Sequence, residues 1–185
     1  MKYLILALAA VAPAACTDST LRYDVPAPAP MERQAVNVRS VEVREVSLPL
    51  YAGLEAITVA DETGALVSNP DVLWADDPVR TFTQGLASAL DQQTTATVAA
   101  EPWPLSEDPD LRLDVRVASA LAGADGQYRL AGQYFAAAPF GDGAPDRSGR
   151  FDISVPFTPG DTGSIARAQG QAIEELARTV ARQSF

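Results

Sequence analysis

Apolar and polar residues alternate with a period of two in three segments of the second half of the chain. These segments are residues 111–118, 128–134 and 151–157. Strict alternation is typical of strands that bury one face. The short Gly/Ala-rich loop Ala122–Gly126 predicts an antiparallel hairpin between the first two strands, and a longer Gly/Pro-rich loop, Pro139–Gly149, leads to the third. The pattern therefore predicts a three-stranded meander.

Two other segments repeat apolar residues every three or four positions, which predicts amphipathic helices. The first covers residues 77–91 and begins at Asp77-Pro78, where an aspartate can cap the helix and proline suits the first helical position. Gly85 within it predicts close packing against a sheet. The second helix covers residues 162–183 and closes the sequence.

The β pattern in the first half of the chain is less regular. Leu21–Val25 is a candidate short strand, and the Val-rich segment 36–48 changes parity twice, which predicts either one bulged strand or two strands. Residues 57–59 and 65–67 are short strand candidates around the turn Asp61–Gly64. The element order predicts an α+β two-layer sandwich, with a mostly antiparallel sheet and two main helices packed on one face.

The N-terminus has the pattern of an export signal. Lys2 precedes the apolar stretch Leu4–Ala12, which is too short to span about 30 Å of hydrocarbon. Ala14-Ala15 then stands directly before Cys16, the only cysteine. We therefore expect residues 1–15 to be a signal peptide.

Two fates of Cys16 are open. The residues before it resemble the lipobox of bacterial lipoproteins, which implies cleavage before Cys16 and acylation of its thiol. The alternative is ordinary secretion with cleavage after Ala14. Lipidation is favoured because a lone thiol in an oxidising compartment otherwise lacks a role. By the same resemblance, Thr17 implies the periplasmic face of the outer membrane in preference to retention at the inner membrane.

The domain organisation follows from these features. The prolines of residues 26–30 exclude a central strand and predict a semi-rigid spacer. We expect residues 16–35 to form a lipidated cysteine and Pro-rich tether, and residues 36–185 to form a single periplasmic α+β domain.

Composition excludes several kinds of chemistry. The chain has no histidine, and its only lysine is Lys2 in the leader, which removes histidine-dependent nucleophiles, the usual zinc sites and Schiff bases. The formal net charge is −10 and the arginines are scattered, so nucleic acid is not an expected partner. We expect no catalytic residues, no cofactor and no metal.

Some polar and aromatic positions allow a second interpretation. Asp76-Asp77 and residues 107–110 could supply a pair of carboxylates for glycoside hydrolysis, but both lie beside proline, where helix caps and turns are more common. Arg112, Asp114 and Arg116 predict a self-compensating solvated strand face; the alternative is a docking surface for an acidic partner. The chain's two tryptophans are expected to be core or helix-entry residues; the alternative is an interface. These tryptophans are Trp74 and Trp103.

Taken in order, the features resemble the PqiC-like family of ABC-type transport auxiliary lipoproteins. The matching elements are the Arg-Tyr-x-Val stretch and prolines of Arg22–Pro30, the element Leu48–Tyr51, and the helix entry Trp74–Asp76, followed by the hairpin and the C-terminal helix. The resemblance implies a non-catalytic adaptor, anchored to the outer membrane. Its implied partner is an MCE-type transport protein or ABC transporter complex that moves lipids between membranes. The alternative is a stand-alone envelope-assembly lipoprotein that supports an outer-membrane protein or a cell-wall component.

Overall fold

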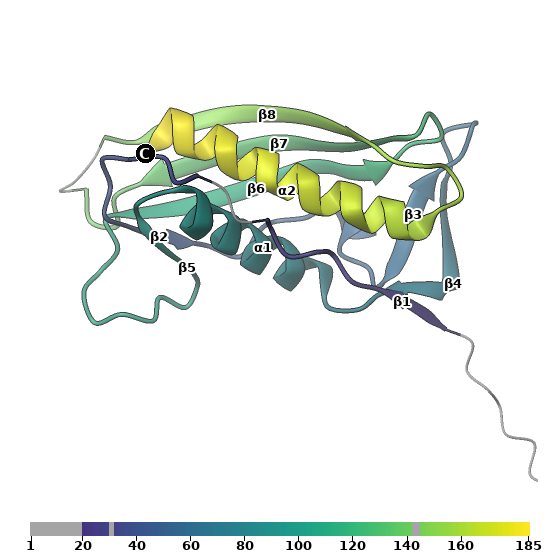
Figure 1. Cartoon of the computed structure of the whole chain (residues 1–185), viewed down its shortest axis with the longest axis horizontal. Helices are drawn as coiled ribbons and strands as arrows, with labels where there is room; N and C mark the ends of the chain where they lie inside the picture. Colours follow the sequence, from purple (N-terminus) through teal and green to yellow (C-terminus); the bar gives the residue numbers. More distant parts are fainter. Residues whose placement is uncertain (1–19, 30–31, 142–144) are drawn as a thin grey trace, which may run out of the picture.

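The computed structural model describes residues 20–29, 32–141 and 145–185, so the predicted signal peptide and Cys16 lie outside the described residues. Figure 1 shows one curved sheet with two helices across one of its faces. This confirms the predicted two-layer α+β architecture. The elements are β1 (Leu21–Tyr23), β2 (Ser40–Val43), the 3-10 helix η1 (Leu50–Ala52), β3 (Ala56–Ala60), β4 (Leu66–Trp74), α1 (Pro78–Gln93), β5 (Thr97–Ala100), β6 (Leu111–Ala122), β7 (Gln127–Ala137), β8 (Arg147–Pro156) and α2 (Thr162–Ser184).

The sheet is mixed, whereas the sequence pattern predicted a mostly antiparallel one. The pairs β3–β4, β6–β7 and β7–β8 are antiparallel, as expected for segments joined by short turns. However, β2 is parallel to both β5 and β6, and β1 is parallel to β4. Parallel neighbours need a long connection between them, and α1 lies within the connection from β2 to β5.

The least regular segments depart furthest from their predictions. Of the Val-rich segment 36–48, only Ser40–Val43 forms a strand, and Ser47 makes an isolated bridge to β6. Strand β5 was not predicted, because four residues are too few to establish a period. Strand β4 is longer than predicted and runs through Pro70, whose side chain lies at an exposed position.

Both predicted helices are confirmed, and their apolar faces cover the sheet. Phe82, Leu86 and Leu90 of α1 and Leu176 of α2 are buried. The predicted packing of Gly85 on the sheet is wrong, because this residue faces α2. A Cβ atom added there would lie 3.6 Å from the side chain of Ile173.

Two tyrosines of β7 connect the sheet to α2. The Tyr128 hydroxyl donates to Gln169 Oε1 at 3.0 Å in a fully buried setting. The Tyr134 hydroxyl donates to Gln183 Oε1 at 2.6 Å, near the end of the helix. The two glutamines lie about four helical turns apart, so these bonds align most of α2 along β7.

Part of the segment predicted to be a tether contacts the folded domain. Strand β1 pairs with β4, and the residues that follow it lie across the groove between α1 and α2. A Cβ atom at Gly170 of α2 would lie 3.2 Å from the Pro26 carbonyl oxygen, and the Ala29 amide donates to the Glu174 carboxylate. The chain is therefore held on the domain from Leu21 to Ala29. Within the described residues, neither helix has the length and apolarity needed to cross a membrane.

Candidate docking surface

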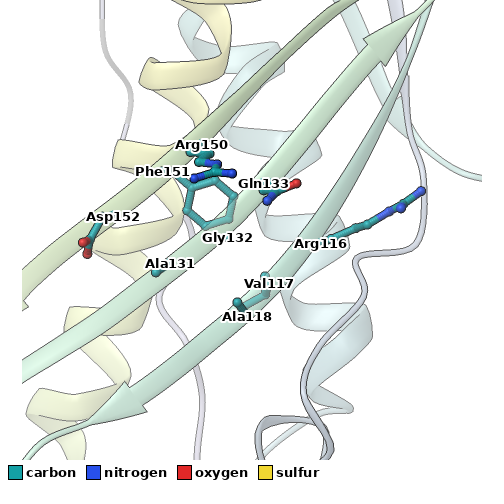
Figure 2. A pocket seen from close by; sticks show the side chains of 9 residues that line it. All are labelled: Arg116, Val117, Ala118, Ala131, Gly132, Gln133, Arg150, Phe151 and Asp152. Atoms are coloured by element: carbon teal, nitrogen blue, oxygen red, sulfur yellow. The ribbon is translucent and has the colours of Figure 1, made fainter.

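The face of the sheet opposite the helices is open. On β6, β7 and β8, alternate side chains are buried under the helices, and those between them point to the other side. Figure 2 views this second face, with Arg116 on β6, Gln133 on β7, and Arg150 and Asp152 on β8. This surface includes the strand face whose function the sequence left open.

A shallow open groove of about 660 Å³ crosses the centre of this face. Its floor is formed by the small residues Ala118 and Ala131, between longer side chains on each side. Ala118 is the extra residue of a β-bulge, since Val117 pairs with Gly132 and Ser119 with Ala131. The groove therefore comes from a local break in strand register.

Gly132 permits this close approach of strands. A Cβ atom at Gly132 would lie 2.2 Å from the carbonyl oxygen of Arg116 and 2.8 Å from Phe151 Cζ. The absent side chain lets Phe151 cover the backbone on the helix side of the sheet.

The groove has a basic side chain fixed at its edge. Arg116 donates to both carboxylate oxygens of Asp114 at 3.1 Å, and its guanidinium carbon lies 4.9 Å from the centroid of the Phe135 ring. Hydrogen bonding to Asp114 raises the pKa of Arg116 above its ordinary value. The pair agrees with the predicted self-compensating face.

Arg112 has a different partner from the one predicted. Its Nε donates at 2.7 Å to Glu42 of β2, and Glu42 also accepts from the backbone amide of Trp103. The Trp103 indole donates in turn to the Glu107 carbonyl at 2.6 Å. Arg112 and Trp103 thus hold the loop between β5 and β6.

Arg150 is available for an intermolecular contact. It lies opposite Gln133 across the β7–β8 ladder and forms no ion pair with any residue that the structure describes. Asp152 lines the same groove two residues further along β8. The surface can therefore offer one free guanidinium and one guanidinium already oriented by Asp114.

The acidic clusters take the structural roles that the sequence favoured. Asp77 caps α1 by accepting from the Arg80 amide at 2.8 Å, and Asp76 pairs with the Arg80 side chain. Asp110 accepts from both the backbone and the guanidinium of Arg39. Among the described residues, no group of three or more acidic, histidine or cysteine side chains could hold a metal ion.

The contact of Tyr51 with β6 was not predicted from the sequence. Its hydroxyl accepts from the Ala120 amide at 3.3 Å and lies 3.5 Å from Ser119 Oγ, just after the bulge. Tyr51 ends the Leu48–Tyr51 element that resembles the family, so this element supports the distorted part of β6. The other tryptophan, Trp74, is buried in the core as expected.

The fold and this surface define a class: an α+β domain with two helices on one side and an open, polar, grooved sheet face on the other. The chain belongs to the ABC-type transport auxiliary lipoprotein family, whose model matches residues 20–181. The resemblance seen in the sequence is thereby confirmed. Family membership indicates an auxiliary role in transport and a location in the cell envelope.

Two solved structures share the fold. One is a crystal structure of an uncharacterized protein, with a TM-score of 0.67 and 17% identity, covering 82% of this chain and 98% of that one. The other, from Xanthomonas campestris and assigned to the family DUF330, has a TM-score of 0.63 and 19% identity, covering 88% of this chain and 93% of that one. A comparison with curated proteins gives no match.

Proposed function

We propose that this protein is a non-catalytic adaptor subunit of an ABC/MCE-type system that transports lipids between the two membranes of the envelope. The observation that supports this role most strongly is the family match across residues 20–181. The open sheet face supplies a physical basis for binding a partner, because it presents polar side chains and a groove. The helices cover the other face of the sheet and complete the core.

In this proposal the open face docks an acidic segment of the transport protein. Arg116 and Arg150 border the groove, and guanidinium groups suit carboxylate partners because they donate in a planar fork. The small floor residues let a backbone approach the sheet closely. Electrostatic pairing of this kind sets the orientation of the two proteins and the rate at which they associate.

The anchor in this proposal is Cys16, acylated after removal of residues 1–15, at the periplasmic face of the outer membrane. Since the described chain is held on the domain from Leu21 to Ala29, this part of the predicted tether of residues 16–35 belongs to the folded domain. The folded remainder, through residue 185, acts as one periplasmic docking domain.

The test is affinity purification of the intact lipidated protein from crosslinked envelopes, followed by identification of its partners. We expect an MCE-type protein, and we expect the variant Arg116→Glu/Arg150→Glu to recover about tenfold less of it. Arg182→Glu is a control, because it makes the same kind of charge reversal on an exposed residue of α2.

Two results would contradict the proposal. Recovery of only an outer-membrane assembly protein or cell-wall components would favour the stand-alone envelope role instead. Equal recovery of the MCE-type protein by both variants would show that the open face is not the docking surface. Mass spectrometry of the processed chain tests the anchor separately, since acylation of Cys16 adds mass and simple secretion does not.

A further inference from the structure

The described residues include seven large hydrophobic side chains that are exposed, and five of them lie on neighbouring elements. These five, which we call the apolar end, are Leu21, Leu50, Leu54, Leu66 and Val67. Leu50 is the most exposed, at 84%. Two or three scattered apolar residues would be unremarkable on a soluble surface, but a concentration on a few adjoining elements marks a contact site.

The sheet order brings the elements of the apolar end together. β1 pairs with β4, β4 pairs with β3, and η1 contacts both β3 and β6. In Figure 1 β1, β3 and β4 occupy the right-hand end of the molecule. Residues 66–71 of β4 are all exposed, so the β3–β4 hairpin projects from the body of the sheet.

The other two exposed hydrophobic residues lie at the opposite end. Leu105 is in the loop before Leu111, where β6 begins, and Phe140 is in the loop after β7. Strand β6 runs from this loop end to Ala122, which pairs with β3. Its twelve residues, at about 3.3 Å each, separate the two ends by roughly 36 Å.

The position of Cys16 in the sequence indicates which of the two ends lies closer to the bilayer. Five residue steps separate Cys16 from Leu21 at the start of β1, so a fully extended chain spans about 17 Å. That length is less than half of the distance along β6. An acyl group on Cys16 therefore keeps Leu21, at the β1 side of the apolar end, within about 17 Å of the bilayer and leaves Leu105 and Phe140 farther from it.

We propose that the apolar end is seated in the interface of the lipid bilayer, which fixes the orientation of the domain on the membrane. This inference rests on the acylation of Cys16 in the proposed function. Two observations support it: the short length of chain between Cys16 and Leu21, and the exposed apolar side chains on β1 and the elements beside it.

The charges at this end indicate that the contact is apolar rather than electrostatic. Across β1, β4 and residues 50–60, Arg22 is the only basic residue, and it pairs with Glu55 at 2.5 Å. Asp61, in the β3–β4 turn, accepts hydrogen bonds from Thr63 and Ala65 in the same turn. Attraction to anionic headgroups needs clustered free cations, which this end does not offer.

The test uses the full lipidated chain on vesicles of phosphatidylethanolamine and phosphatidylglycerol that contain a doxyl-labelled quencher lipid. Because Cys16 is the only cysteine, an introduced cysteine is the only free thiol once Cys16 is acylated. An environment-sensitive fluorophore is placed at Leu66→Cys, with Leu105→Cys as the matched control of similar exposure. A circular dichroism spectrum verifies that each labelled protein is folded.

We expect the quencher lipid to lower the emission about twofold at position 66, as for a side chain held at acyl-boundary depth, and to leave the emission at position 105 unchanged. The quenching at position 66 should persist in high salt. In a protein labelled at Leu50→Cys, the change Val67→Asp should reduce quenching, whereas Leu105→Asp should not.

The failure of this inference is distinguishable from failure of the proposed function. A chain without acyl mass that does not bind vesicles would remove the anchor itself. If the chain is acylated and vesicle-bound but the quenching is equal at positions 66 and 105, only the contact of the apolar end with the bilayer is overturned. The inference would also be overturned if the emission at position 66 changed only when a partner protein was added, because the apolar end would then be a protein interface.

Discussion

Gly132 connects a single residue type to the shape of the open face. A methyl group there would meet the Arg116 carbonyl and the Phe151 ring at distances that real Cβ atoms do not adopt. We expect Gly132→Ala to destabilise the fold by about 1–3 kcal/mol, the usual range for overpacking, because one obstacle is backbone in a paired strand. Urea unfolding measures the change.

Gly85→Ala is the matched control for this prediction. Its new Cβ would make ordinary contacts at 3.6 Å with Ile173, and alanine favours a helix over glycine by about 1 kcal/mol. We therefore expect the control to be neutral or stabilising. Equal destabilisation by both variants would contradict the role assigned to Gly132.

Asp110 gives a pH dependence at the residue scale. Hydrogen bonds from Arg39 lower its pKa below the ordinary value, despite partial burial. A carboxyl group whose pKa is lowered on folding stabilises the native state above its unfolded pKa, near 3.9, and loses that contribution as pH falls through the folded pKa. We expect wild type and Asp110→Asn to differ in stability at neutral pH and to converge as the pH falls through the folded pKa of Asp110.

Measuring urea midpoints for both proteins from neutral to acidic pH would test this sign. Asp71→Asn is a suitable control, because Asp71 is exposed and its side chain makes no ion pair within the described segments. A gap between wild type and Asp110→Asn that widened toward acid would be inconsistent with a stabilised carboxylate.

At the scale of elements, α2 is held by two hydrogen bonds of unequal importance. Gln169 is buried, so Tyr128→Phe leaves its carbonyl oxygen without a partner or water. Gln183 is exposed and can be solvated when Tyr134→Phe removes its partner. We expect a loss of about 1–2 kcal/mol for Tyr128→Phe and less than about 0.5 kcal/mol for Tyr134→Phe.

Thermal and urea unfolding of the two variants would measure this difference. Both changes remove a single hydroxyl from the same strand, so each controls for the other. A larger loss for Tyr134→Phe would show that exposure of the glutamine does not decide the cost.

The same elements show how far the sequence predicted the structure. Strands β6, β7 and β8 and both helices were found because each is long enough for burial to impose a clear period on its residues. β5 has only four residues and leaves no local signal. β2 lies within the predicted Val-rich segment 36–48, but its parallel pairing with strands that are distant along the chain leaves no local signal. Element length and the separation of partners therefore set the limit of the prediction.

The candidate site shows the same limit. The alternation of Arg112, Asp114 and Arg116 predicted an exposed strand face, and the structure confirms the Asp114–Arg116 pair. The partner of Arg112 is Glu42, which is 70 residues away in sequence. The groove depends on a bulge at Ala118, and an alanine among small residues does not reveal that the strand register shifts there.

At the scale of the whole molecule, the two proposed contact surfaces should respond differently to salt. The open face acts through Arg116 and Arg150, and exposed charges are screened as the Debye length falls from about 10 Å at 0.1 M to about 3 Å at 1 M. The apolar end offers Leu and Val side chains, whose burial salt does not weaken. We expect high salt to reduce partner recovery while vesicle quenching at position 66 is retained.

Both readouts can be taken from one preparation of lipidated protein across a salt series. Partner recovery that did not change with salt would argue against arginine-dependent docking. Loss of quenching at position 66 in high salt would argue that headgroup charge, rather than apolar burial, holds this end.

The pairing of β1 with β4 has a consequence for biosynthesis. Tyr23 takes Trp74 as its partner, and the Ala29 amide binds Glu174, 145 residues later. β1 can therefore pair as soon as β4 is present, whereas the segment after it completes its packing only when α2 is present. A truncated product that lacks α2 could still pair β1 with β4, but residues 24–29 would lose their contacts with α2 and be open to proteases.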